Sequence, residues 1–146
     1  MDKLFNSTFE ISMRLLILLD EYDMPKTLDM LHVIDFMALY SALFGITEQN
    51  LNGDNDYKFS VFASHRESIH EALKALVLNG AIQAVSCCDG LAYIITPEGE
   101  DFCQSLESDY AKEYRVNARA VINIAANRSE RSLVNAIYKL SASSFN

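Results

Sequence analysis

The sequence predicts a mostly helical α+β fold: a winged helix-turn-helix core with a β-hairpin wing and additional N- and C-terminal helices. The prediction rests on three features between Ser64 and Leu106: a capped amphipathic helix, two short apolar runs separated by Asp89-Gly90, and a second capped helix. Asp-Gly between apolar runs indicates a hairpin, because a tight primed turn needs positive φ at its central residues. Helix, hairpin and helix in this order are typical of a winged helix.

Local capping signals place the elements of this core. Ser64 and Glu67 form the pattern of a capping box, which predicts a helix beginning at about His65. Thr96 has the N-cap position before Pro97, a residue that the first turn of a helix accepts without cost. The predicted elements are helices over about 65–78 and 96–106, and strands over 81–87 and 91–95.

Further helices are predicted on both sides of the core. The pattern Ser7-x-x-Glu10 is a second capping box, and it opens a helix that continues to Tyr22. The segment Thr27–Phe44 is apolar on more than one face, which indicates a helix central to the fold or to an interface. The remaining predictions are a mobile loop over 50–56, a short strand or extended segment over 57–62, and helices over about 110–125 and 129–140.

Length and composition fit one domain over residues 1–146, with the winged-helix core at about 9–106 and a C-terminal helical extension at about 108–141. No uninterrupted apolar run approaches the ~20 residues of a membrane span. The N-terminus has no signal-peptide pattern, so we expect a cytoplasmic protein that does not contact a membrane. The three cysteines lack metal-ligand spacing and are expected to be reduced and structural: Cys87, Cys88 and Cys103.

Charge is distributed unevenly along the chain. The net charge is −8, but residues 1–111 hold 6 Lys and Arg against 18 Asp and Glu (−12), and residues 112–146 hold 6 against 2 (+4). A basic tail on an acidic body can bind a partner, or it can pair with its own body as a solvated basic face. The partner-binding candidates on this tail are Arg115, Arg119, Arg128 and Arg131, with Tyr110 and Tyr114 on the same long helix.

Asp35 is the most informative carboxylate, because it interrupts an apolar helix. One interpretation is an exposed position on a polar stripe, which we favour since charged residues in such helices usually face outward. The other is a buried carboxylate paired with Arg14 or Arg66, which would make Asp35 an interface or switch residue. Asp35 is therefore also a partner-binding candidate.

We find no pattern that carries catalysis. The glycines occur singly at ends and turns, which excludes a Gly-rich phosphate loop, and there is no Gly-x-Ser-x-Gly nucleophile motif. His65 and His70 are one residue too far apart to share a helical face, and His32 lies among apolar neighbours, where a packing role is expected. We therefore expect no enzyme activity, catalytic residue, metal site, cofactor or small-molecule substrate.

DNA binding would use the helix that begins at about His65. Its candidate contacts are Arg66, His70 and Lys74, but Glu67 and Glu71 cancel the charge of the two cations. The wing tip also lacks a cation. Since phosphate contacts supply most of the affinity for DNA, we expect only weak, indirect or non-specific binding.

Several segments of the chain resemble the small middle component of bacterial ABC three-component systems, which include Lamassu-type anti-phage and anti-plasmid defence. They are Phe5–Ile11, Arg14–Leu16, Leu28–Phe36, Tyr93–Gly99, Tyr110 and Arg119. The chain departs from the family where the latter often has a His-Ser-Gly-Asp turn, since it reads Tyr-Ser-Ala-Leu-Phe-Gly over 40–45. The resemblance implies a non-enzymatic subunit whose partners are an SMC-like ATPase and an effector such as a nuclease.

The function expected from this resemblance is an accessory subunit that docks to the ATPase and couples DNA sensing to effector activation. One alternative is a winged-helix transcription regulator resembling the multiple-antibiotic-resistance repressor family. Another is an antitoxin-like inhibitor that holds an effector inactive. A regulator should carry a basic recognition helix and a basic wing, and this chain has neither.

Overall fold

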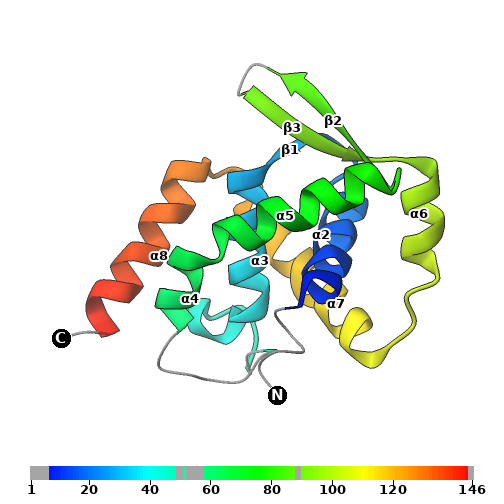
Figure 1. Cartoon of the computed structure of the whole chain (residues 1–146). Helices are drawn as coiled ribbons and strands as arrows, with labels where there is room; N and C mark the ends of the chain where they lie inside the picture. The colour runs from blue at the N-terminus through cyan, green and yellow to red at the C-terminus, as the bar shows by residue number, and fades with distance from the viewer. Residues whose placement is uncertain (1–6, 49–50, 52–57, 88–89, 145–146) are drawn as a thin grey trace.

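The computed structural model describes residues 7–48, 51, 58–87 and 90–144, which form a mostly helical α+β structure with a small antiparallel sheet (Figure 1). The sheet lies at one edge of the molecule, over helices that pack against one another. The elements in chain order are α2 (Thr8–Tyr22), β1 (Lys26–Thr27), α3 (Leu28–Leu39), η1 (Ser41–Phe44), α4 (Lys58–Ser64), α5 (Arg66–Leu78), β2 (Ile82–Cys87), β3 (Gly90–Ile95), α6 (Pro97–Gln104), α7 (Asp109–Ala125) and α8 (Glu130–Ser144).

The N-terminal helix α2 has a capping residue at each end, Ser7 and Asp23. The Ser7 hydroxyl accepts a hydrogen bond from the Glu10 amide at 3.2 Å, as the predicted cap requires. Asp23 ends α2 in the left-handed conformation at φ 54°, and its amide donates to the Leu19 carbonyl. The capped start and the end before Pro25 confirm the predicted helix.

The sequence predicts one helix over residues 27–44, but this apolar segment forms two separate helices. Thr27 caps α3 by accepting from the Met30 amide, but the helix ends at Leu39. Tyr40 takes a non-helical conformation at ψ 42°, and the short 3₁₀ helix η1 follows and ends at Gly45 with φ 71°. The hydrophobic periodicity continues across this break, which is why the sequence did not reveal it.

The start of α5 corrects two predictions. Residues 57–62 were expected to be extended, but α4 begins at residue 58. Ser64 is the last residue of α4, and the N-cap position of α5 is His65, which has a helical conformation and makes no side-chain capping bond. The predicted loop over 50–56 lies outside the described residues, except for Leu51.

The sheet joins the predicted hairpin to a strand that the sequence did not indicate. Its order is β1-β3-β2, all antiparallel, with Thr27 opposite Ala92 and Ile82 opposite Ile95. Gly90 has φ 107°, which suits the hairpin turn, while Asp89 lies outside the described residues. The two-residue β1 was missed because it is too short to show an alternating pattern.

The helix after the hairpin is fixed tightly against it. The Thr96 hydroxyl caps α6 by accepting from the Gly99 amide at 3.1 Å, and it also donates to the carbonyls of Gly80 and Ala81. A Cβ on Gly99 would lie 2.1 Å from the Ala81 carbonyl oxygen. Only glycine therefore fits where α6 approaches the end of α5.

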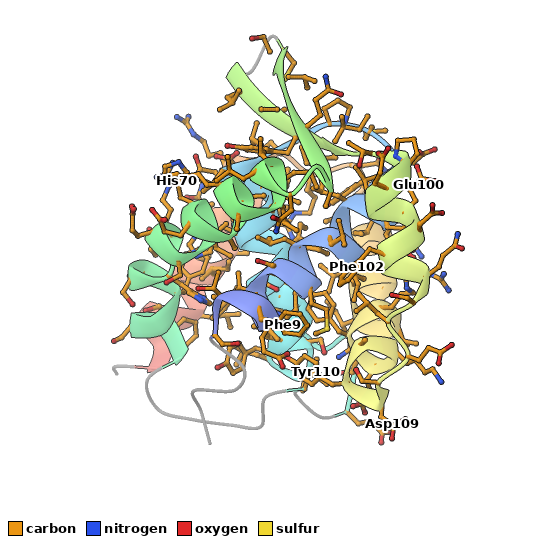
Figure 2. All side chains as sticks on the ribbon, turned by 45° about the vertical axis from the view of Figure 1, so that its right-hand side comes forward. Phe9, His70, Glu100, Phe102, Asp109 and Tyr110 are labelled. Atoms are coloured by element: carbon orange, nitrogen blue, oxygen red, sulfur yellow. The ribbon has the colours of Figure 1, made fainter. Side chains whose placement is uncertain are left out.

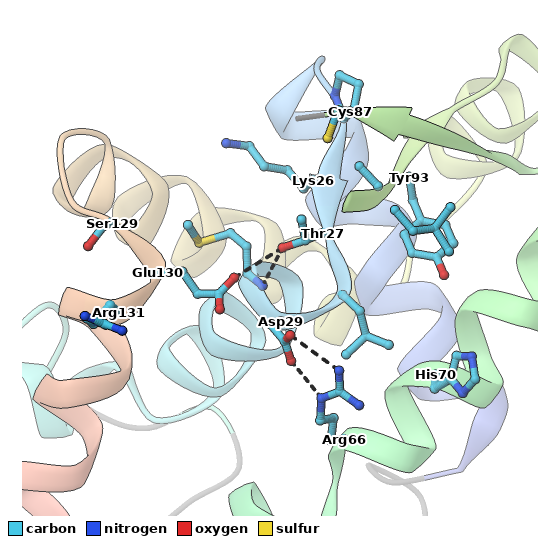
Figure 3. A pocket seen from close by; sticks show the side chains of 15 residues that line it. Lys26, Thr27, Asp29, Arg66, His70, Cys87, Tyr93, Ser129, Glu130 and Arg131 are labelled. Carbon is cyan, nitrogen blue, oxygen red and sulfur yellow. Dashed lines mark hydrogen bonds and ion pairs between the residues drawn. The ribbon is translucent and has the colours of Figure 1, made fainter. Parts of the chain in front are cut away.

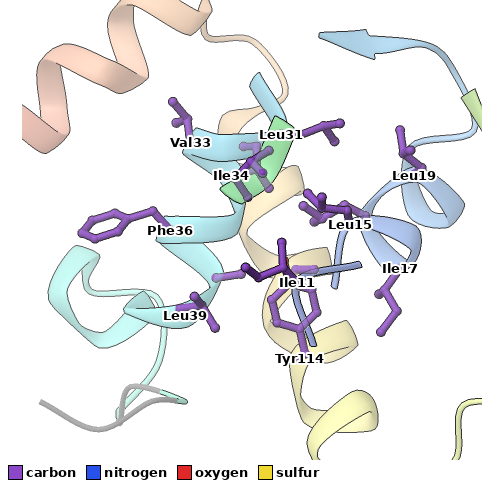
Figure 4. Packing of buried hydrophobic residues seen from close by; sticks show 14 of the residues in the cluster. Ile11, Leu15, Ile17, Leu19, Leu31, Val33, Ile34, Phe36, Leu39 and Tyr114 are labelled. Atoms are coloured by element: carbon purple, nitrogen blue, oxygen red, sulfur yellow. The ribbon is translucent and has the colours of Figure 1, made fainter. Parts of the chain in front are cut away.

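The core is formed mainly by α2, α3 and α7, with α5 packed across α2. Figure 4 shows side chains of α2 and α3 facing one another, with Tyr114 of α7 between them. Helix α2 is buried on nearly all sides, including Leu15, Leu16 and Leu18 at 0% exposure. Helix α8, at the left of Figure 1, contacts α3 and buries Leu133 and Ile137. It is the most peripheral of the long helices.

Candidate functional site

Asp35 is buried, so the favoured prediction of an exposed stripe was wrong. The side chain is 2% exposed and accepts hydrogen bonds from Arg14 Nε at 2.9 Å, Arg14 Nη2 at 3.2 Å and the Tyr114 hydroxyl at 2.7 Å. Arg14 and Tyr114 are both 0% exposed. The alternative with Arg14 as partner is therefore correct, and Arg66 lies elsewhere. Three hydrogen bonds join α2, α3 and α7 at one carboxylate.

Electrostatics keep both members of this pair charged. Burial by itself would raise the pKa of Asp35, but the Arg14 guanidinium and the Tyr114 hydroxyl outweigh it and hold that pKa below its ordinary value. Burial likewise opposes the charge on Arg14, yet Asp35 brings the pKa of the guanidinium above its ordinary value. Burial also raises the pKa of Tyr110 to about 12, with Arg14 partly opposing the shift.

Arg14 is the member of this network that the sequence indicates only as a possible partner of Asp35. A signal for it existed, since Arg14 and Asp35 each interrupt an apolar helix and carry opposite charges. Two such helices bury their charges most cheaply by packing against each other. Tyr114 was assigned to a partner-binding surface, but it lies in the core.

Arg115 and Arg119 pair with the acidic end of α2. Arg115 Nη1 donates to Asp20 Oδ2 at 2.8 Å and also to Glu21, and Arg119 Nε donates to Glu21 Oε1 at 2.8 Å. Burial would raise the pKa of Glu21, but the two arginines lower it overall. These contacts favour the interpretation of a basic face that pairs with the acidic body. Partner binding by Arg115 and Arg119 stays a prediction.

The same arginine also reaches a buried thiol. Arg115 Nη2 lies 2.9 Å from Cys103 Sγ, and burial raises the pKa of that thiol to about 11, against the influence of the guanidinium. Cys103 is thus a neutral packing residue between α6 and α7. Cys87 is exposed and also free, and Cys88 lies outside the described residues.

Arg128 and Arg131 lie at the start of α8, far along the chain from the Asp20–Glu21 pair. Arg128 Nε donates to the Ser132 hydroxyl at 2.9 Å and its Nη2 donates to the Ser132 carbonyl, so its guanidinium lies along α8. A hollow of about 430 Å³ on the outer face of α8 is lined only by this helix and the two residues before it: Arg128, Ser129, Arg131, Ser132, Asn135, Ala136 and Lys139. Its lining contains three cations and no carboxylate.

A larger cleft of about 810 Å³ opens next to this hollow (Figure 3). It lies between β1 and the start of α3, the hairpin, α5 and the start of α8. Thr27 and Glu130 share a hydrogen bond across it at 3.4 Å, and Asp29 binds Arg66. Ser129 and Arg131 line both the cleft and the α8 hollow, so the two are neighbours on the surface.

The DNA-contact candidates on α5 each lie beside a carboxylate. Arg66 makes a two-pronged ion pair with Asp29, at 2.7 and 3.4 Å, in which both side chains are about half exposed. His70 lies 3.9 Å from Glu67, and Lys74 lies 3.9 Å from Glu71. This face of α5 therefore offers little net positive charge to a phosphate backbone.

Two histidines form a second polar cluster, with His32 buried and His65 partly buried. His32 is stacked on Phe62 at 4.3 Å between ring centroids, and His65 meets His32 edge-on at 6.5 Å. The Nε2 atoms of both histidines are buried and have no hydrogen-bond partner among the described residues, so the packing role expected for His32 leaves one polar atom unsatisfied there. Burial lowers the pKa of both rings.

One group of side chains is close enough to hold a metal, among the residues that the structure describes. It consists of Glu67, His70 and Glu71 on the exposed side of α5. Exposed acidic groups of this kind are common without an ion. The cluster therefore gives no reason to revise the expectation of no metal site.

An apolar surface lies on the opposite side of the molecule from α8. Phe9 and Phe102 are 63% and 49% exposed, and both line a hollow of about 260 Å³ between α2, α5 and α6 (Figure 2). Exposed aromatic rings at a hollow are typical of contact surfaces. The sequence pattern does not reveal this patch, because its residues come from three helices.

None of the helices in the described part of the chain combines the length and the apolar character that crossing a bilayer requires.

The fold, the buried network and the paired surface charges define a small, mostly helical α+β protein whose described polar groups serve mainly to join helices. Its family follows from the sequence, since the family model described as ABC-three component (ABC-3C) system Middle Component 2 matches residues 4–146. The chain belongs to this family. No curated protein and no solved structure matches it.

Proposed function

We propose that this chain is a non-enzymatic accessory subunit that docks to an SMC-like ATPase and couples DNA sensing to an effector nuclease, in a Lamassu-type defence system of the bacterial cytoplasm. The observation that carries the proposal is membership of a middle-component family over almost the whole chain. A middle component implies protein partners, so binding surfaces on this chain are expected to matter more than a catalytic centre.

We also propose that residues of the sheet and α5 form a winged helix. The order α2, β1, α3, α5, β2, β3, with η1 and α4 inserted between α3 and α5, and the sheet order β1-β3-β2 support this assignment. The proposed wing is the β2–β3 hairpin, which projects from the edge of the molecule (Figure 1). In this proposal the winged helix is a scaffold for protein contacts.

The runner-up is a transcription regulator that reads DNA with α5. Pairing of Arg66 with Asp29, and the position of Lys74 beside Glu71, count against it. We expect free DNA to bind no more tightly than the non-specific range of ~10⁻⁴ to 10⁻⁶ M at physiological salt. A nanomolar palindromic operator would favour the regulator.

The proposed function is tested by co-expressing the chain with the ATPase and effector components of its own system, with an affinity tag on the ATPase. We expect this chain to co-elute with the ATPase through size-exclusion chromatography in a fixed ratio. An antitoxin-like inhibitor would instead co-elute with the effector alone. A chain that elutes free of both components would overturn the proposal.

A further inference from the structure

The outer face of α8 has rows of side chains with a hollow beside them, a surface against which another helix can pack. Within α8, Ser132 and Ala136 lie in one row at a spacing of four, and residues 131, 135 and 139 form a parallel row at the same spacing. Arg128 precedes the helix, and its guanidinium lies beside the first row through its hydrogen bonds to Ser132. Rows four residues apart are the ridges of an α-helix, and helices pack by placing a ridge of one into the groove between two ridges of the other. The 430 Å³ hollow on α8 lies between these two rows.

The side chains of the groove set its depth and charge. Its middle is formed by Ser132, Asn135 and Ala136, whose side chains are short and allow a second backbone to approach. Its ends carry the cations Arg128, Arg131 and Lys139. The groove is therefore shallow and neutral in the middle and positive at the end where Arg128 and Arg131 lie, on a chain whose net charge is −8.

We propose that this groove on α8 binds an acidic α-helix of another component of the complex. Charge complementarity selects the occupant, because arginine binds carboxylates in a planar two-pronged geometry. Arg128 is already held along α8 by Ser132, which reduces the entropy that binding would cost it. The inference deepens the proposed function and rests on it only for the identity of the component that supplies the helix.

Duplex DNA is the other polyanion that the cations of this groove could attract. Tight DNA binding uses on the order of six to ten phosphate contacts, whereas the groove offers three cations. The adjoining cleft contributes Asp29 and Glu130 as well as cations, which weakens its attraction for a continuous phosphate backbone. The helix is therefore the better fit.

The test uses the full-length chain and two fluorescein-labelled, alanine-based helical peptides of equal length. One carries glutamate at every third or fourth position, and the other carries glutamine at the same positions. We expect the glutamate peptide to bind about tenfold tighter or more by fluorescence anisotropy at physiological salt. Equal binding of both peptides would overturn the proposal.

Variants of groove residues test whether the glutamate peptide binds at α8. Arg128→Glu with Arg131→Glu should weaken binding of the glutamate peptide about tenfold or more, and Asn135→Trp should weaken it similarly by filling the groove without a change of charge. The matched control, Lys74→Glu with Lys112→Glu, makes the same change in net charge elsewhere and should alter binding less than about threefold. Thermal melts of all variants show which of them are folded. If the charge reversals unfold the chain, Asn135→Trp still tests the groove, because it changes no charge.

Three results would contradict the proposal. If the control variant weakens binding as much as the groove variants, the attraction is general. If a 20-base-pair duplex binds more tightly than the glutamate peptide and loses binding in the groove variants, the groove is a nucleic-acid site. If the groove variants bind the glutamate peptide as the wild type does, the helix docks elsewhere. Co-elution of the wild type with the ATPase tests the proposed function separately from these outcomes.

Discussion

Replacing Asp35 with alanine is expected to destabilise the fold by about 3–5 kcal/mol, because the change leaves the Arg14 charge buried without a partner. The carboxylate accepts two hydrogen bonds from Arg14 and one from Tyr114, and all three side chains are within 2% of complete burial. A typical domain is stable by about 5–15 kcal/mol, so this substitution removes a large part of the total.

Two further variants separate the contribution of the Tyr114 hydroxyl from that of the Arg14–Asp35 ion pair. Tyr114→Phe removes only the hydroxyl that donates to Asp35 at 2.7 Å, and a hydrogen bond to a charged group contributes about 1.5–3 kcal/mol. Replacing both charges, Arg14→Met with Asp35→Leu, should cost much less than the sum of the single changes, since no uncompensated charge remains. Together with the single variants Arg14→Met and Asp35→Leu, the double variant closes a double-mutant cycle that measures the coupling between α2 and α3.

The assay is urea unfolding followed by circular dichroism, with the midpoint and the slope reported for each variant. Asp29→Ala is the matched control, because its ion pair with Arg66 is half exposed and should contribute no more than about 1 kcal/mol. If Asp35→Ala costs no more than Asp29→Ala, the carboxylate is not buried in a charged network and the reasoning fails.

Three other predictions concern the ion pairs of Arg115 and Arg119, the pKa of His32, and the contact of α6 with the backbone at Gly99. Arg115→Glu should lower the melting temperature more than Arg119→Glu, because the Arg115 side chain is 23% exposed and that of Arg119 is 61% exposed; equal shifts in thermal melts would contradict this. Burial lowers the folded pKa of His32, so the unfolded chain binds more protons and stability falls as pH decreases below about 6.5. His32→Phe should reduce the slope of unfolding free energy against pH in that range, and an unchanged slope would refute the assignment. Gly99→Ala should cost about 1–3 kcal/mol in urea unfolding, since its Cβ would meet a backbone oxygen; an unchanged midpoint would show that α6 can move away.

Capping and turn chemistry made much of the fold predictable from the sequence. Ser7 and Thr96 accept the backbone hydrogen bonds that their positions implied, because a cap depends only on residues three apart. The pattern at Ser64 and Glu67 placed the start of α5 correctly at about His65, but the N-cap position is His65, because Ser64 is still the last residue of α4. A capping pattern predicts the N-cap residue correctly when the residues before it are not themselves part of a helix.

The candidate site was less predictable, because it depends on which face of each helix turns inward. An apolar helix such as α3 has no clear polar face, so the sequence could not show that Asp35 points into the core. Pairing of Arg115 with Asp20 joins residues 95 positions apart and is invisible to periodicity. The charge asymmetry of the chain did show that a basic helix and an acidic body were available to pair.

The central proposal is that this chain is the middle subunit of an ATPase complex, and light scattering on the co-expressed components tests it most directly. Size-exclusion chromatography coupled to light scattering gives the mass of every species that contains this chain. The account predicts one peak whose mass requires the ATPase and this chain together, at physiological salt. A homodimer of this chain that elutes apart from the ATPase and binds a palindromic duplex at nanomolar concentration would contradict it.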